Sequence, residues 1–165
     1  MSNFRPKRGK DMDKLWAPWR SKYLYLRKNK KCIFCSNKPS DAKTNYIIER
    51  SRHSFAMLNI YPYNNGHVMA APYRHVGSLD KLTDDELTDL FGLVNKVKVR
   101  IDKSLKPHGY NIGLNIGKVG GAGFAGHVHV HIVPRWTGDT NFMPVTAGTK
   151  VISESLGAMY RLLKK

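Results

Sequence analysis

The stretch GHVHVHIVPRW, residues 126–136, places three histidines at strict two-residue spacing on an apolar background. Side chains alternate between the two faces of a β-strand, so we expect His127, His129 and His131 on one face. The valines and the isoleucine between and after them would then face a core. Same-face neighbours lie roughly 6.5–7 Å apart. Three titratable rings side by side pack a core poorly, so this strand predicts a chemical site.

Two kinds of chemistry suit a row of imidazoles. They can chelate a metal, since imidazole nitrogen binds zinc well. A neutral imidazole can also attack phosphorus and form a phosphohistidine. The segment before the histidines, KVGGAGFAG (118–126), is rich in glycine, which lets backbone N–H groups approach an anion closely. A glycine-rich loop beside a nucleophilic histidine favours phosphoryl or nucleotidyl transfer.

The rest of the chain predicts an α+β fold. We expect strands at 45–50, 53–60, 67–72, 109–117 and 127–133, the last ended by Pro134. Thr83 and Glu86 form a capping-box pattern, which opens an amphipathic helix of about twenty residues that ends before Pro107. The apolar stripe of this helix, expected to be core, is Leu87, Leu90, Phe91, Val94, Val97 and Ile101. A final helix is expected at roughly 150–163, and this order favours an α+β sandwich over a doubly wound parallel sheet.

The chain is strongly basic, with 28 Lys or Arg against 12 Asp or Glu and a formal charge of +16. Such a charge favours polyanionic partners. Eleven of the basic residues lie within 1–31, which we interpret as a solvated arm, a nucleic-acid-binding arm or an aid to the capture of an anionic substrate. Residues 1–10 are expected to be a disordered basic tail, and 11–165 a single domain. With no apolar run of membrane-spanning length and no secretory signal, we expect a cytoplasmic protein without a membrane partner.

Cys32 and Cys35 are the two cysteines and form a CIFC motif. Three interpretations compete. A disulfide is disfavoured in a reducing cytosol, and a redox Cys-x-x-Cys would need a thioredoxin-like βαβ context that the sequence does not show. Half of a zinc site would need two more ligands elsewhere in the chain. The pair alone does not decide between these interpretations.

The histidine row resembles the signature of the histidine triad (HIT) superfamily, in which three histidines alternate with apolar residues. The similarity extends to MLNIYPYNNGHVMAAPYRHV (57–76), which looks like the nucleoside-binding strand, turn and strand of the family. The stretch NIGKVGGAGFAGHVHVHIVPRWTGDTNFMPV (115–145) and the LWAPWR arm (15–20) resemble the diadenosine polyphosphate hydrolase and phosphorylase branch. The resemblance covers roughly residues 14–155. It implies an antiparallel sheet of about five strands with one long helix and a C-terminal helix.

The resemblance also implies a two-step reaction. His129 would be the nucleophile that attacks the α-phosphorus of a nucleoside polyphosphate, and His131 would stabilise charge at the reacting phosphate. Water in a hydrolase, or inorganic phosphate in a phosphorylase, would then release the nucleotide from the nucleotidyl-histidine. The residues implied in substrate binding are Leu58, Asn59, Ile60, His67, Asn115, Gly123, Phe124 and Gly126. A divalent cation bound with the polyphosphate is a further expectation.

The roles of the binding residues follow from their places in the family pattern. Asn59 falls where the family binds the ribose, and Leu58 and Ile60 would help to flank the base. Many relatives carry Gln-Ser or Gln-Thr in the loop before the triad, where this chain has Gly123 and Phe124. Backbone N–H groups would therefore have to bind the phosphate in this loop.

One subset of the family binds structural zinc, and the resemblance to it implies that the CIFC motif supplies two of the zinc ligands. The subset's ligands fall here on Cys32, Cys35, His75 and His127, and two thiolates with two imidazoles suit tetrahedral zinc. In this case His127 would serve the metal, while His129 and His131 carry the chemistry.

Four hypotheses remain open at this point. The leading one is a nucleotidyl hydrolase or transferase that acts on dinucleoside polyphosphates such as Ap4A. The second is a hydrolase of AMP conjugates, an adenosine phosphoramidase, with the same fold. The third is a basic nucleic-acid-binding module, and the fourth is a metalloenzyme that uses the histidine row as ligands. The resemblance also implies a homodimer.

Overall fold

The computed structural model describes residues 32–36, 45–139, 146 and 151–164. The expected basic tail at 1–10 and the arm that follows it lie outside these residues, as does the RWTGDTNFMPV stretch beyond Asp139. The described part contains the whole histidine row, the CIFC motif and the elements between them.

Five antiparallel strands form one sheet in the order β1-β2-β3-β5-β4. The strands are β1 (Ile47–Arg50), β2 (Ser54–Leu58), β3 (Val68–Pro72), β4 (Gly109–Leu114) and β5 (Val130–Arg135). All five predicted strands are therefore present, and the α+β prediction with about five antiparallel strands is confirmed. β5, which carries the end of the histidine row, lies between β3 and β4 and pairs with both.

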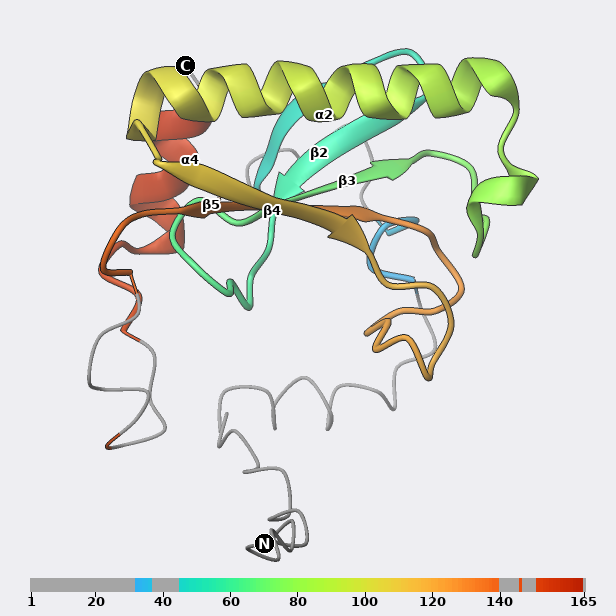
Figure 1. The fold of residues 1–165 in the computed structure, drawn as a ribbon. Coiled ribbons are helices and arrows are strands. Elements are labelled where there is room, and N and C mark those ends of the chain that lie inside the picture. Colours follow the sequence, from blue (N-terminus) through green and yellow to red (C-terminus); the bar gives the residue numbers. More distant parts are fainter. Residues whose placement is uncertain (1–31, 37–44, 140–145, 147–150, 165) are drawn as a thin grey trace, which may run out of the picture.

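Two helices accompany the sheet, α2 (Asp84–Leu105) and α4 (Leu156–Lys164), with a short 3-10 helix η2 (Leu79–Lys81) before α2. Figure 1 shows α2 running along one face of the sheet, with α4 beside it. The capping box is formed, since Thr83 Oγ1 accepts the Glu86 N–H at 3.2 Å and the Glu86 carboxylate accepts the Thr83 N–H at 2.9 Å. The helix ends at Lys106, which has the left-handed conformation, directly before Pro107.

The buried face of α2 differs in one respect from the predicted stripe. Leu90, Val94 and Val97 are buried as expected, but Phe91 is 43% exposed and Leu93 takes its place in the core. Successive helical residues are rotated by about 100°, so Phe91 lies at the border of a stripe centred on Leu90. A pattern of three- and four-residue steps does not by itself separate a border position from a central one.

Apolar side chains cover both faces of the central strands, which is why β2 and β3 are buried along their whole length. One face packs under α2 and α4 and forms the larger core cluster, which includes Ala56, Leu58, Val68, Ala70, Val130 and Ile132. The other face carries a second cluster, made of Cys32, Phe34, Ile47, Phe55, Met57, Met69 and Ala71, with Phe124 packed against it. The CIFC segment therefore lies on the face opposite to α2.

The histidine row enters the sheet later than predicted. Strand pairing begins at Val130 rather than at residue 127, and it continues through Pro134 to Arg135. Pro134 is tolerated because β3 pairs with β5 only as far as Ile132, so no β3 carbonyl requires an N–H at Pro134. Upstream of the pairing, the Val128 N–H donates to the Val76 carbonyl at 2.6 Å, which holds the first two histidines against the segment after β3.

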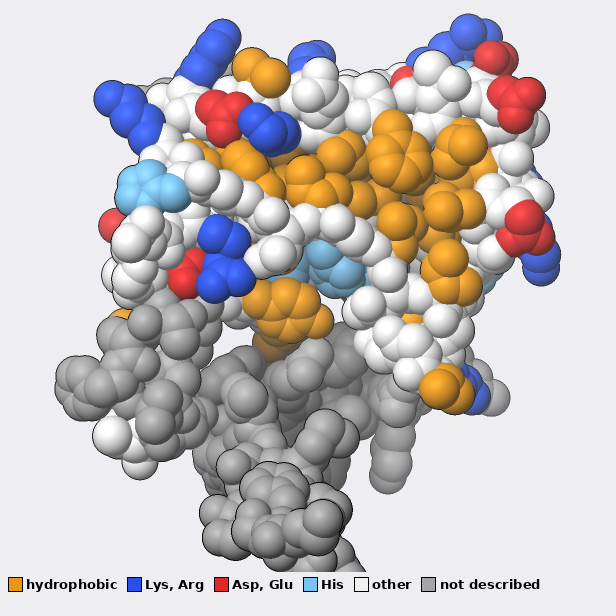
Figure 2. All heavy atoms as spheres, viewed as in Figure 1, with side chains coloured by type: hydrophobic (Ala, Val, Ile, Leu, Met, Phe, Trp, Pro, Cys, Tyr) orange, Lys and Arg blue, Asp and Glu red, His pale blue; other side chains and the backbone are white. Residues whose placement is uncertain are grey.

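The surface shows one apolar region on the side viewed in Figure 2, where hydrophobic side chains gather between α2 and the edge strand β4. Exposed apolar residues of these elements include Phe91 on α2 and Ile112 on β4, which is 44% exposed. None of the helices in the described part of the chain has the length and apolarity that crossing a bilayer requires.

Candidate active site and metal site

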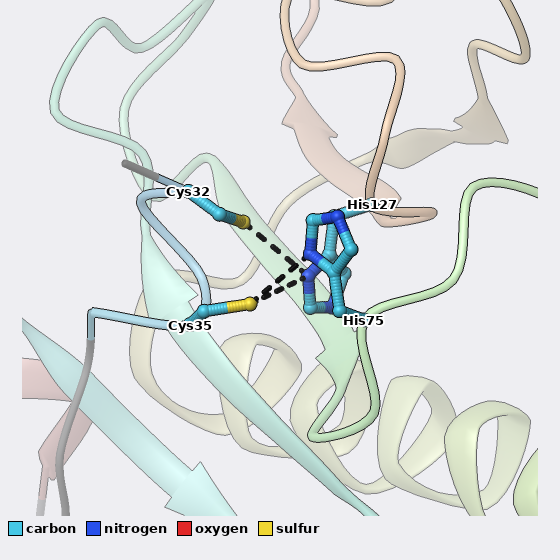
Figure 3. Close-up of side chains that lie close together, drawn as sticks. All are labelled: Cys32, Cys35, His75 and His127. Carbon is cyan, nitrogen blue, oxygen red and sulfur yellow. Dashed lines mark hydrogen bonds between the residues drawn. The ribbon is translucent and has the colours of Figure 1, made fainter. Parts of the chain in front are cut away.

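Four side chains from three separate segments meet beyond the end of β3 and before the start of β5: Cys32, Cys35, His75 and His127 (Figure 3). One ligand atom from each lies within 4.8 Å of all the others. Cys35 Sγ is 3.1 Å from His75 Nδ1 and 3.6 Å from His127 Nδ1, and Cys32 Sγ is 3.4 Å from the same His127 nitrogen. The structure thus brings together all four residues that the family resemblance assigned to a metal.

The geometry of this cluster suits a tetrahedral ion. Zinc–sulfur bonds of about 2.3 Å and zinc–nitrogen bonds of about 2.0–2.1 Å place sulfur and nitrogen ligands roughly 3.6 Å apart at the tetrahedral angle. His127 Nε2 donates to the Pro72 carbonyl at 2.8 Å, so the lone pair of this neutral ring is on Nδ1, which faces the two sulfurs. The donor set is two thiols and two imidazoles, and it fits zinc.

The pKa values of Cys35 and His127 decide which of the two can bind a metal without first losing a proton. Desolvation of the thiol and the adjacent Cys32 raise the pKa of Cys35 to about 11, so this sulfur holds its proton at neutral pH without a metal. Burial lowers the pKa of His127, which keeps its ring neutral. A bound cation would stabilise the thiolates, and the neutral ring is ready to ligate.

The second histidine of the row, His129, is held in one orientation by the first. His129 Nδ1 donates to the backbone carbonyl of His127 at 2.8 Å. The hydrogen is therefore on Nδ1, and the lone pair of the neutral ring is on Nε2, on the far side of the imidazole. Burial of the ring, which is 4% exposed, lowers the pKa of His129 and favours this neutral form. A neutral imidazole with a free, oriented lone pair is a competent nucleophile.

The third histidine takes part in a chain of hydrogen bonds across the sheet. The Tyr63 N–H donates to His67 Nδ1 at 3.0 Å. Because a backbone N–H can only donate, His67 carries its hydrogen on Nε2, and this atom donates to His131 Nδ1 at 2.9 Å. His131 in turn must carry its own hydrogen on Nε2. The chain of hydrogen bonds therefore leaves an N–H donor on His131, whose ring centre is 4.9 Å from that of His129.

Burial also keeps His67 and His131 neutral. Desolvation is the largest cause that lowers the pKa of His67 to about 3, followed by the charges that His131 and His129 would carry. Desolvation and then His129 lower the pKa of His131 to about 4. At neutral pH the site thus contains uncharged imidazoles, and within the described residues neither the lone pair of His129 Nε2 nor the N–H of His131 Nε2 has a hydrogen-bond partner.

The predicted nucleoside-binding residues are placed unevenly. Asn59 is buried at the end of β2, and its Oδ1 accepts the Tyr61 N–H at 2.9 Å, so the amide shapes the turn that precedes His67. Ile60 is 47% exposed beside it. Leu58, by contrast, packs in the core cluster under α2, because side chains alternate along β2. The structure therefore does not bring the Leu58 side chain to the histidine face.

The C-terminal end of the glycine-rich loop lies beside the cysteine–histidine cluster. Gly123 and Gly126 are exposed, whereas the ring of Phe124 lies near His75 and Phe34. A side chain on Gly126 would meet His75 Nε2 at 3.4 Å, so glycine there permits the close approach of the loop to the metal ligand. Asn115 lies at the end of β4, where its Nδ2 is 3.4 Å from the Gly121 carbonyl.

The sequence did not predict two residues that lie beside the site, Gly113 and Phe34. Gly113 on β4 is directly opposite His131, and a β-carbon at this position would have no neighbouring atom within 4 Å among the described residues. Phe34, between the two cysteines, packs its ring against His129 at a centroid distance of 4.7 Å. Its position inside the CIFC motif was visible in the sequence, but its contact was not.

Comparison with known proteins agrees with this geometry. The family model of the HIT domain matches residues 40–138. The chain is 40% identical over 162 residues to an AP-4-A phosphorylase of Mycobacterium tuberculosis, covering 92% of this chain and 83% of that protein. It is 42% identical over 93 residues to an asymmetrical bis(5'-nucleosyl)-tetraphosphatase of Schizosaccharomyces pombe, covering 56% of this chain and 50% of that protein.

A solved structure shows the same architecture. A histidine triad nucleotide-binding protein of Sulfolobus tokodaii superposes with a TM-score of 0.61 and 29% identity, covering 81% of this chain and 87% of that one. The fold, the histidine row and the matched family model lead to the same assignment. The chain belongs to the HIT domain family.

Proposed function

We propose that the protein is a nucleotidyl hydrolase or transferase that cleaves dinucleoside polyphosphates at the α-phosphate through a nucleotidyl-histidine intermediate. The observation that carries the proposal is the bond between His129 Nδ1 and the His127 carbonyl, which leaves Nε2 as a buried, neutral nucleophile. The relatives named AP-4-A phosphorylase and bis(5'-nucleosyl)-tetraphosphatase support the substrate class.

The proposed reaction follows from the tautomers of His129 and His131. His129 Nε2 attacks the α-phosphorus, a P–N bond forms, and the bridging P–O bond breaks with its electron pair on the leaving nucleotide. The N–H on His131 Nε2 donates to an oxygen of the reacting phosphate as negative charge builds there. The Nδ1–H of His129 stays on the His127 carbonyl, which stabilises the positive charge of the phosphorylated ring. Water or inorganic phosphate then forms the new P–O bond, and the P–N bond breaks.

We infer that the metal held by Cys32, Cys35, His75 and His127 is a structural zinc ion. When bound, zinc would fasten the CIFC segment to the residues around β3 and β5 and would contribute no Lewis-acid step at the phosphate. The donor set and the 3.1–3.6 Å separations between sulfur and nitrogen atoms support this role. Metal analysis of protein purified without chelator is expected to give one zinc per chain, and a value far below one would contradict the inference.

We also infer that the protein forms a homodimer through β4 and α2. β4 pairs on one side with β5, and in the described residues its other edge has no partner strand. Ile112 on β4 and Phe91 on α2 are exposed, and Figure 2 shows hydrophobic side chains gathered between these two elements. An edge strand beside an apolar surface is suited to association with a second copy. Sedimentation of the native protein and of Ile112→Lys tests this, and a native monomer would refute it.

The activity is tested by product analysis with Ap4A, with and without inorganic phosphate. AMP and ATP would identify a hydrolase, and ADP and ATP formed only with phosphate would identify a phosphorylase. Brief incubation with radiolabelled Ap4A should leave a nucleotide on the chain that is lost in His129→Asn. His108→Gln is the matched control, because His108 is exposed, lies outside the site and contacts Thr137. Cleavage of an adenosine phosphoramidate but not of Ap4A would refute the dinucleoside assignment, and turnover by His129→Asn would refute the nucleophile.

A further inference from the structure

One of the two residues between Cys32 and Cys35, Phe34, has an aromatic side chain that points inward. Phe34 is 2% exposed, whereas its neighbours Ile33 and Cys35 are exposed. The turn that carries it is closed by Ser36, whose N–H and Oγ both donate to the Cys32 carbonyl, at 2.9 and 2.8 Å. The conformation of this turn therefore fixes where the Phe34 ring lies relative to the two sulfurs.

The Phe34 ring contacts two of the three histidines of the row. Its centroid is 4.7 Å from that of His129, with an interplanar angle of 35°, and 5.0 Å from that of His127. Phe55 and Phe124 lie farther away, each at a ring-centroid distance of 6.5 Å from Phe34. Phe34 is thus a buried connection between the metal site and the ring that we assign as the nucleophile.

One hydrogen bond is a weak constraint on an imidazole. The outer torsion of histidine is broad, so a ring anchored only at Nδ1 can swing about this bond and move Nε2. A neighbouring aromatic ring that packs against the imidazole restricts this swing, because the imidazole cannot rotate into the space that its partner fills. A displacement of about 1 Å in a reacting atom can reduce a rate on the order of 100-fold.

We propose that Phe34 is a positioning residue for His129, and that metal binding by the cysteines on either side of it sets the aim of the His129 lone pair. The cluster acts on His129 through two links. One is the His127 carbonyl, which accepts the Nδ1–H, and the other is the Phe34 ring, which packs on the imidazole. This inference rests on the proposed function, and it gives the CIFC segment a role in the speed of the chemical step as well as in stability.

The first test compares Phe34→Leu with Phe55→Leu in zinc-loaded protein. The two residues are neighbours in one buried cluster, but Phe55 stacks on Tyr73, whereas Phe34 packs on His129. We expect Phe34→Leu to form the nucleotidyl-enzyme about tenfold more slowly or worse, with KM within about twofold of the native value. Phe55→Leu is expected to lose stability and keep the native rate. Equal rates in the two variants would overturn the proposal.

The second test observes the His129 ring directly and needs no substrate. In nitrogen-15 labelled protein, the Nδ1–H signal of His129 should exchange slowly with water when zinc or cobalt is bound, and faster after chelation. In Phe34→Leu the metal should no longer slow this exchange, while the Nε2–H of His127 on the Pro72 carbonyl stays protected. If Phe34→Leu fails to hold metal, Phe34→Met is measured in its place. A metal-dependent slowing that is the same in the native protein and in the variant would overturn the proposal.

The two tests also separate this inference from the proposed function. A native protein that forms no nucleotidyl-histidine with any of the probes would refute the function, yet the exchange of the His129 Nδ1–H would still show whether Phe34 and the metal hold the ring. If the native protein is active but the exchange rate of the His129 Nδ1–H changes neither with Phe34→Leu nor with metal removal, the inference alone would be refuted.

Discussion

Acidification should destabilise this protein through His67, and a single variant can isolate the effect. His67 is 1% exposed and accepts the Tyr63 N–H, and burial is the main cause that lowers its pKa to about 3. In the unfolded chain the same side chain has a pKa of about 6.5. As the pH falls below 6.5 the unfolded chain therefore binds a proton that the folded protein refuses. Stability is present above pH 6.5 and is lost as the pH falls toward the folded-state pKa.

The size of the loss at pH 5.0 does not depend on the folded-state pKa, provided that this pKa lies well below 5. Each pH unit below 6.5 costs about 1.36 kcal/mol for a histidine that stays neutral when folded, so 1.5 units cost ~2 kcal/mol. Unfolded-state carboxyl groups have pKa values of about 4 and contribute little above pH 5. A domain with a free energy of unfolding of about 5–15 kcal/mol would show this change clearly.

The assay is urea unfolding of the native protein and of His67→Gln at pH 7.5 and 5.0, followed by circular dichroism. Gln keeps a hydrogen-bonding side chain but does not titrate, so the variant should lose ~2 kcal/mol less than the native protein between the two pH values. Zinc release on acidification affects both proteins and cancels in this difference. Equal losses in the two proteins would refute the claim that His67 is neutral in the folded state.

Three further predictions concern stability and the metal. Thr83→Ala removes the acceptor for the Glu86 N–H at the start of α2 and should lower the free energy of unfolding by about 1 kcal/mol, measured by urea unfolding. Leu90→Ala empties a fully buried position under the sheet and should cost about 2–5 kcal/mol, and a loss below 1 kcal/mol would contradict its place in the core. Cys35→Ser should bind zinc more weakly, and its melting temperature should no longer fall when chelator is added, whereas that of the native protein should fall.

Much of the fold followed from local patterns. The capping box at Thr83 and Glu86, the stripe around Leu90 and the alternation at 126–136 each depend on residues within one or two turns or strand steps of one another. Such patterns are set by backbone geometry, which is the same in any protein. The structure differs from these predictions at the edge of the apolar stripe of α2 and at the ends of β5. Phe91 is exposed at the edge of its stripe, and β5 runs through Pro134 because its β3 partner ends earlier.

The candidate site was predicted in composition but not in arrangement. The family resemblance named all four residues of the metal cluster, and the structure brings them within 4.8 Å. It also named His67, but the bond from His67 to His131 depends on the antiparallel register of β3 and β5, which sets His67 next to the row. Leu58 was expected at the base and is instead in the core, because the face that it occupies is decided by the pairing of β2.

The sequence by itself determined which chemical groups this protein has: a row of three imidazoles on one side of a strand, a pair of thiols, a glycine-rich loop and a long capped helix. Only the tertiary structure decided what each imidazole does. His127 faces the sulfurs, and among the described residues the His129 lone pair and the His131 N–H have no hydrogen-bond partner. Each tautomer is set by a partner far away in the sequence or by the backbone bend before β5. The contact of Phe34 with His129 likewise arises from packing between segments that are 95 residues apart, and no local pattern encodes such a contact.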